Sequence, residues 1–240
     1  MKRKIFVSAL LALAVITIGS AQDLDKILKD HFKAVGQKNL DKITSLETTG
    51  TASSMGMDMG FVMQAKRPDK LKIVIEVQGA QIIQAVDGQT VWAVNPMMGS
   101  STPMELTGAE AENLIGQADM DGPLWNYEEK GHQLALEGTE DVNGKECYVL
   151  KLTKSNDNTD YYFIDKESSL IQKVRTSTVS NGVPMEVEAF QSNYKDVGGY
   201  MMPFSIEQRV GGQVMMNLDL ENVEANVAID DAVFAKPASN

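Results

Sequence analysis

Alternation of apolar and polar residues dominates the chain from about residue 45 onward, and this period of two predicts β-strands. The clearest run is 70–78, in which Leu71, Ile73, Ile75 and Val77 alternate with mostly polar positions. Such a run indicates a sheet with one buried face and one face in water. The same pattern predicts strands at 46–54, 57–67, 70–78, 80–87, 89–95, 133–138, 146–153, 159–165, 170–180, 184–194, 203–210 and 213–221.

Short turn signals separate these runs, among them Pro68-Asp69, Asn143-Gly144 and two glycine pairs at 198–199 and 211–212. Successive strands joined by short turns predict an antiparallel meander of roughly ten to twelve strands. So wide a sheet must curl or split, because twist accumulates from strand to strand. We therefore predict a mainly β (α+β) fold whose concave apolar face needs a cover.

Two segments have the period of a helix and could supply that cover. The first is 24–35, where six residues form one apolar stripe that ends at Gly36. His31 lies within this stripe, and we interpret it as a helix residue beside the core. The second begins with the capping-box pattern of Thr107 and Glu110 and continues as a short, weak apolar face.

A stripe of thioether side chains marks the candidate ligand-binding face. Alternate residues of the strand 57–67 point to one side of a sheet, and on that side the strand is rich in methionine. Methionine is flexible and suits a variable, greasy ligand such as an acyl chain, although the same residues could simply fill a core. The candidate acyl groove comprises Met57, Met59, Phe61, Met63, Leu71, Ile73, Ile75, Val77, Leu114 and Ile115.

Soft thioethers also bind Cu(I), and Met55, Met57, Met59 and the pair 97–98 would then be the ligands. Alternate side chains of an extended strand do not converge on one ion without a bulge. We therefore expect no resident metal and no cofactor.

Arg67 has the same parity as the methionines and ends their strand, just before Pro68. It could be an ordinary surface arginine. If the alternation holds, its charge instead lies at the rim of an apolar concavity. There its planar guanidinium is well suited to bind carbonyl groups of a covering helix.

The N-terminus has the layout of a secretory signal peptide. A basic start at Lys2, Arg3 and Lys4 precedes an apolar run at 5–18, followed by small residues up to Ala21. We predict cleavage after Ala21, which leaves one domain over 22–240 in the periplasm, soluble and without a lipid anchor. A retained membrane anchor is the alternative.

Composition excludes several classes of function. The chain has a formal net charge of −11, and loss of the three N-terminal basic residues makes it −14. So acidic a chain lacks the basic surface that nucleic acid requires. No nucleophile, metalloprotease or phosphate-loop motif occurs, so we expect no enzyme activity. The single cysteine, Cys147, begins an apolar run and is interpreted as a buried thiol.

Two stretches resemble the LolA family of periplasmic lipoprotein carriers. The first is 65–71, which contains Lys66-Arg67-Pro68, and the second is 86–96, which has the form Asp-Gly-x-Thr-x-Trp-x-x-Asn-Pro. The segment 230–234 and the exported amphipathic helix also fit. Segments at 194–199 and 202–204 are similar to the wider superfamily of lipoprotein-sorting and envelope-stress proteins.

This resemblance implies a half-barrel with helices covering its concave side. It also implies a carrier that binds acylated lipoproteins or other lipids and moves them between the two membranes. The partners would be an inner-membrane release complex and an outer-membrane acceptor, and Arg67 would hold the helical lid closed over an empty groove. A non-catalytic sensor of lipid or of a partner, which regulates envelope stress through the same fold, is the alternative.

Overall fold

The computed structural model describes residues 16–180 and 183–238, and over these residues the chain forms one antiparallel sheet of thirteen strands. The order across the sheet is β6-β5-β4-β3-β2-β1-β13-β12-β11-β10-β9-β8-β7. The strands are β1 (Ser45–Ser54), β2 (Met57–Lys66), β3 (Lys70–Val77), β4 (Ala80–Asp87), β5 (Thr90–Asn95), β6 (Ser100–Glu105), β7 (Gln133–Val142), β8 (Lys145–Thr153), β9 (Thr159–Asp165), β10 (Ile171–Ser180), β11 (Val183–Val197), β12 (Tyr200–Val210) and β13 (Gln213–Ala225).

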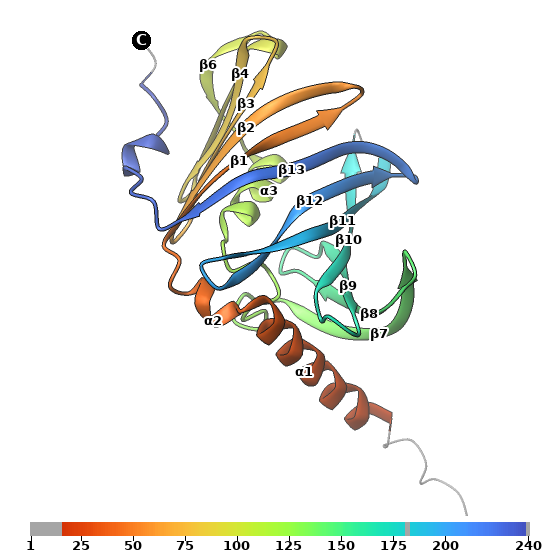
Figure 1. The fold of residues 1–240 in the computed structure, drawn as a ribbon. Coiled ribbons are helices and arrows are strands. Elements are labelled where there is room, and N and C mark those ends of the chain that lie inside the picture. The colour runs from red at the N-terminus through yellow and green to blue at the C-terminus, as the bar shows by residue number, and fades with distance from the viewer. Residues whose placement is uncertain (1–15, 181–182, 239–240) are drawn as a thin grey trace, which may run out of the picture.

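The sheet curves without closing, because β6 and β7 lie at its two free ends and do not pair with each other. Almost every connection is a hairpin between neighbours, and one long connection from β6 to β7 crosses the concave side. Figure 1 shows β1 to β6 forming one half of the curve and β7 to β12 the other half, with α3 between them. The predicted curved half-barrel of antiparallel strands is thus confirmed.

Register fixes which residues share the concave face. Leu71 of β3 lies opposite Ala65 of β2 and Val86 of β4, and Val86 lies opposite Val91 of β5. Residues that face each other across antiparallel strands point to the same side of the sheet. All four belong to one buried cluster with residues of α3. The concave face is therefore the one that carries the predicted apolar alternation.

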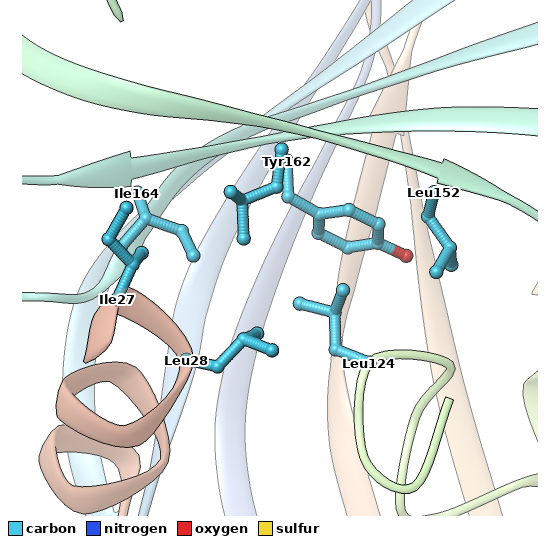
Figure 2. Packing of buried hydrophobic residues seen from close by; sticks show 7 residues of the cluster. Ile27, Leu28, Leu124, Leu152, Tyr162 and Ile164 are labelled. Carbon is cyan, nitrogen blue, oxygen red and sulfur yellow. The ribbon is translucent and has the colours of Figure 1, made fainter. Parts of the chain in front are cut away.

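Three helices contribute to the covers: α1 (Ile16–Val35), α2 (Gln37–Leu40) and α3 (Gly108–Ala118). The helix α1 packs Ile27 and Leu28 against Leu152, Tyr162 and Ile164 of β8 and β9. Figure 2 shows these side chains pointing toward one another, with Leu124 of the loop after α3 closing the cluster. One half of the sheet is thus covered by α1 and the other half by α3.

The opposite, convex face is covered in part by the C-terminal segment. Trp92 of β5 points to this face and is buried, and its indole Nε1 donates a hydrogen bond of 2.8 Å to the carbonyl of Phe234. Phe234 follows the short helix η2 (Asp231–Val233) and is itself fully buried. Nearby, Asp231 forms an ion pair with Lys66 at 2.6 Å. The segment after β13 therefore straps the strands β2 to β5 from outside.

The structure corrects several details of the prediction. The sheet has one strand more than the upper prediction of twelve, and β6 is the strand that the pattern missed, since its sequence is polar and contains Pro103. The short helix η1 (Pro96–Met98) precedes it. Thr107 does precede α3, but its side chain makes no capping hydrogen bond, so the capping box is not formed.

The predicted signal peptide cannot be compared with the structure, because most of its apolar run lies outside the described residues. Its last part, 16–21, forms the beginning of α1. Among the described helices, none has the length and the apolar character needed to cross a membrane. The predicted cleavage after Ala21 stays a prediction.

Candidate functional site

The candidate site is the concave apolar face beneath α3. Leu71 of β3 and Leu114 of α3 are almost fully buried in the same cluster. Met63, Ile73 and Ile115 are partly buried and pack against that cluster. The helix α3 thus covers these strands through contacts between its apolar side chains and those of the sheet.

The remaining predicted groove residues lie on the same face but outside this cluster. Phe61 lies opposite Ile75, and both are only partly buried, as are Met59 and Val77. Met57, the first residue of β2, is 46% exposed. The concave face therefore changes from a covered region near α3 to a more open region toward the start of β2.

Arg67 lies at the other end of β2 and joins three segments. Its Nε donates to the carbonyl of Ile43 at 2.9 Å, and its Nη2 donates to the carbonyl of Leu40 at 3.2 Å. Its Nη1 and Nη2 also donate to the two carboxylate oxygens of Asp121, at 2.8 and 2.5 Å. Leu40 ends α2, and Asp121 lies in the loop after α3. The end of α2 and the loop after α3 are thus connected to the end of β2 through one guanidinium.

The electrostatics of this pair are mutually favourable. Each side chain is about one quarter exposed, so water screens the pair only in part. The hydrogen bond from Arg67 lowers the pKa of the Asp121 carboxyl, and the same bond raises the pKa of Arg67. A two-pronged arginine–carboxylate pair also fixes geometry, because both donors and both acceptors are planar.

The loop after α3 has further anchors. Lys130 forms an ion pair with Asp119 at 2.5 Å and donates to the carbonyl of Gly122 at 2.7 Å. Met120 packs against both the α3 cluster and a third cluster formed by Leu40, Ile43 and Phe204. The loop is therefore held by a polar attachment at Asp121 and an apolar one at Met120.

The α1 cover meets this loop at two aromatic residues. Phe32 and Trp125 make an edge-to-face contact with ring centroids 4.9 Å apart. A hollow of about 250 Å³ lies beside them, lined by Phe32, Leu124, Trp125, Asn126, Tyr127, Glu128 and Glu129. A second hollow, of about 500 Å³, lies at the ends of β11 and β12, and its lining includes Glu186 and Glu188. Those two carboxylates make the second hollow unsuitable for a hydrocarbon chain.

Both histidines and the cysteine are held by burial or by hydrogen bonds within the fold. His31 is buried, and its Nδ1 donates to the carbonyl of Ser169 at 2.9 Å, while burial lowers its pKa. His132 accepts a hydrogen bond from the backbone N–H of Ser155. Cys147 is fully buried on the convex side, and burial raises the pKa of its thiol to about 11. The interpretation of His31 and Cys147 as packed residues agrees with these positions.

Sequence reasoning missed Asp121, Lys130 and Trp125. Their segment is rich in turn residues and shows no periodicity, so it offered no local signal. The one available hint was that an arginine expected at an apolar rim needs an acidic partner. Within the described residues, no group of three histidine, cysteine, aspartate or glutamate side chains could hold a metal ion. The Cu(I) alternative concerns methionines and stays open.

Solved structures of similar shape cover nearly the whole chain. A DUF1329 family protein from Desulfovibrio piger has a TM-score of 0.60 at 15% identity, and the match covers 87% of this chain and 97% of that one. A LolA superfamily protein from Nitrosomonas europaea has a TM-score of 0.59 at 17% identity, over 90% and 98% of the two chains. A domain from Vibrio parahaemolyticus named for outer-membrane lipoprotein sorting has a TM-score of 0.56 at 12% identity, over 88% and 97%.

No protein-family model and no curated protein matches the sequence. The comparison therefore rests on shape. At sequence identities of 12–17%, similarity of shape shows a shared fold and does not show a shared function. The fold is LolA-like, as the motifs at 65–71 and 86–96 indicated.

Proposed function

We propose that the protein is a carrier that takes acyl chains of lipoproteins, or of other lipids, into the concave face of its sheet. The observation that carries this proposal is the double attachment of Arg67. One side chain at the end of β2 is bonded both to the end of α2 and to the loop after α3. Release of that single group would remove the polar attachment that the end of α2 and the loop after α3 share at the rim of an apolar concavity.

The physical need for such a carrier follows from hydrocarbon solubility. Burial of a methylene group is worth about 0.8 kcal/mol, so a chain of about 16 carbons resists transfer into water by roughly 13 kcal/mol. Several chains in a fully dry pocket would bind too tightly for release, since useful affinities end near about 20 kcal/mol. The groove must therefore hold a lipid about as well as a bilayer does.

Closure of the covers would keep the groove from holding a lipid too tightly. In the closed arrangement Leu114 and Ile115 occupy the face that an acyl chain would use. The hollow beside Phe32 is about 250 Å³, which is below the usual size of a ligand pocket. A lipid must therefore displace the covers. Their contacts with the sheet are lost when lipid binds and regained when it leaves, which offsets part of the binding free energy.

The remainder of the proposal concerns the cell compartment in which the protein acts and its partners there. The predicted signal peptide would deliver the protein to the periplasm, where lipids cross an aqueous space. There it would receive cargo from an inner-membrane release complex and deliver it to an outer-membrane acceptor. The protein itself would perform no chemistry, which agrees with the absence of catalytic motifs from the sequence.

The direct test is the content of the protein recovered from its own cell envelope. Processed protein purified without detergent is extracted with solvent, and the extract and the intact protein are measured by mass spectrometry. Bound acyl lipid or lipoprotein is the expected result. The variant Ile75→Glu, which places a carboxylate on the concave face, should lose the lipid, whereas Lys72→Glu on the opposite face should keep it. Lipid-free wild-type protein would contradict the proposal.

A further inference from the structure

A second surface, which shares Met57 with the candidate groove and otherwise lies outside it, is formed by hairpin turns along one edge of the sheet. Because the strands are antiparallel, the turns β1–β2, β3–β4, β5–β6 and β12–β13 all lie at the same edge. Figure 1 shows the β1–β2 and β12–β13 hairpins projecting to the same side of the molecule. The hydroxyl of Ser54 donates to the carbonyl of Met215 at 2.8 Å, so these two turns are joined directly.

This edge holds most of the exposed apolar side chains. Eight large apolar side chains are exposed in the described part of the chain, and six of them lie in or beside these turns. We call this set the methionine rim: Met55, Met57, Met97, Met98, Val214 and Met215. Met55 is 84% exposed and Met98 is 83% exposed. Side chains so exposed contribute almost nothing to the core, so packing does not explain their presence.

The same turns carry no charge. Although 23% of the chain is charged, no Asp, Glu, Lys or Arg occurs in 53–57, 77–85, 94–104 or 210–218. The opposite edge has the contrary character, with Arg67, Asp69 and Lys70 in one turn and Lys195 and Asp196 in another. The β8–β9 turn lies at the same edge in the other half of the curve and carries Lys154 and Asp157. An acidic protein that must approach phospholipid can do so with least repulsion through the uncharged half of this edge.

From these observations we infer that the methionine rim docks on the surface of a phospholipid bilayer. The rim is divided over several turns, which suits a fluid surface better than a shaped pocket on a protein. Methionine is flexible and adapts to such an irregular partner. Apolar side chains at turn tips enter the boundary between headgroups and acyl chains, as the apolar face of an interfacial helix does. Binding then depends on buried apolar area, so salt has little effect on it.

This inference goes beyond the proposed function, because the rim can dock whether or not the concave face binds lipid. Its test uses the exported, processed protein, whose N-terminus is first checked by mass spectrometry to lie beyond the apolar run 5–18. The protein is floated with vesicles of pure phosphatidylcholine at low and at high salt. We expect binding at both salt concentrations.

The variant that tests the rim replaces Met55, Met98 and Met215 with serine. These side chains are exposed, so the fold should persist, which circular dichroism checks. Vesicle binding should fall about ten-fold because the apolar area that can enter the interface is largely removed. The matched control, Val62→Ser, removes an exposed apolar side chain from the middle of β2 and should bind like wild type.

A site-specific probe gives an independent reading. Cys147 is buried with its thiol pKa raised to about 11, so an added exposed cysteine can be labelled selectively. An environment-sensitive dye at Met98→Cys should shift its emission to the blue with vesicles, and a dye at Val62→Cys should not. Equal binding by the serine variant, loss of binding in salt, or equal shifts from both dyes would overturn the inference. Binding only to native membranes, and not to pure lipid, would also overturn it and assign the rim to a protein partner.

Discussion

The guanidinium of Arg67 holds both carboxylate oxygens of Asp121, although 54 positions separate the two residues along the chain. Two further donors of the same group are directed at the carbonyls of Ile43 and Leu40. The end of β2, the end of α2 and the loop after α3 therefore meet at a single side chain. Predictions about opening of the concave face follow from this relationship.

Replacement of Arg67 should loosen the covers without unfolding the sheet. Arg67→Leu removes every bond of the guanidinium and should lower the free energy that holds the covers closed by about 1–3 kcal/mol. Amide hydrogen exchange should then become roughly ten-fold or more faster in α3 and in the loop at 119–124, and stay unchanged in the central strands. Arg67→Lys keeps the charge but loses the planar fork, so it should give an intermediate rate. Unchanged exchange in Arg67→Leu would show that Arg67 does not hold the covers closed.

The pair of Arg67 and Asp121 should also weaken in acid. Because the pKa of Asp121 is lowered in the folded protein, its contribution to stability is fully present above its ordinary value of about 3.9. The contribution is lost as pH falls through the lowered pKa, where the carboxyl takes up a proton. The difference in unfolding free energy between wild type and Asp121→Asn should therefore be constant near neutral pH and shrink below about pH 4. A difference that is independent of pH down to acid unfolding would contradict this assignment.

His31 should produce a second pH dependence at higher pH. Burial lowers its pKa, so the folded state favours the neutral imidazole. Its contribution to stability is present above the ordinary value of about 6.5 and is lost as pH falls toward the lowered pKa, because the unfolded chain takes up the proton first. Denaturant titrations between pH 7.5 and pH 5 should show a larger loss in wild type than in His31→Gln. Burial also lowers the pKa of His132, so His132→Gln should remove a separate part of the loss, and a variant that lacks both histidines should remove both parts.

The C-terminal strap should stabilise the half of the sheet that carries the groove. Phe234 is fully buried and its carbonyl accepts the hydrogen bond of Trp92, so Phe234→Ala should cost about 3–5 kcal/mol. Phe234→Leu should cost less, because it leaves a smaller cavity. In a Trp125→Phe background the fluorescence of Trp92 should shift to the red in the alanine variant. A variant as stable as wild type would show that the strap is dispensable.

Much of the fold was predictable because the alternation is regular. The residues 70–78 show one apolar face so clearly that β3 and its neighbours could be placed within a residue or two. The strand β6 was missed because an edge strand buries little and its sequence therefore carries no apolar pattern. The sequence also could not decide which side Trp92 faces. Its burial on the convex side depends on Phe234, which lies 142 positions away.

The candidate site was predictable only in part, for a related reason. The shared face of Leu71, Ile73 and Met63 follows from strand parity, and their contact with α3 follows from the need to cover an apolar surface. The partner of Arg67 does not follow from any local pattern. Asp121 lies in an aperiodic loop and is placed by the packing of Met120 on two clusters, which is a tertiary relationship. The functional assignment of the groove residues stays a prediction.

The central claim, that acyl chains enter the concave face, is tested most directly by photocrosslinking from two adjacent positions of β3. A benzophenone amino acid replaces either Ile75, on the concave face, or Val74, on the opposite face, and the processed protein is irradiated with a radiolabelled triacylated lipopeptide. The account predicts strong crosslinking from position 75 and little from position 74. Equal crosslinking from both positions, or crosslinking from position 74 alone, would contradict it.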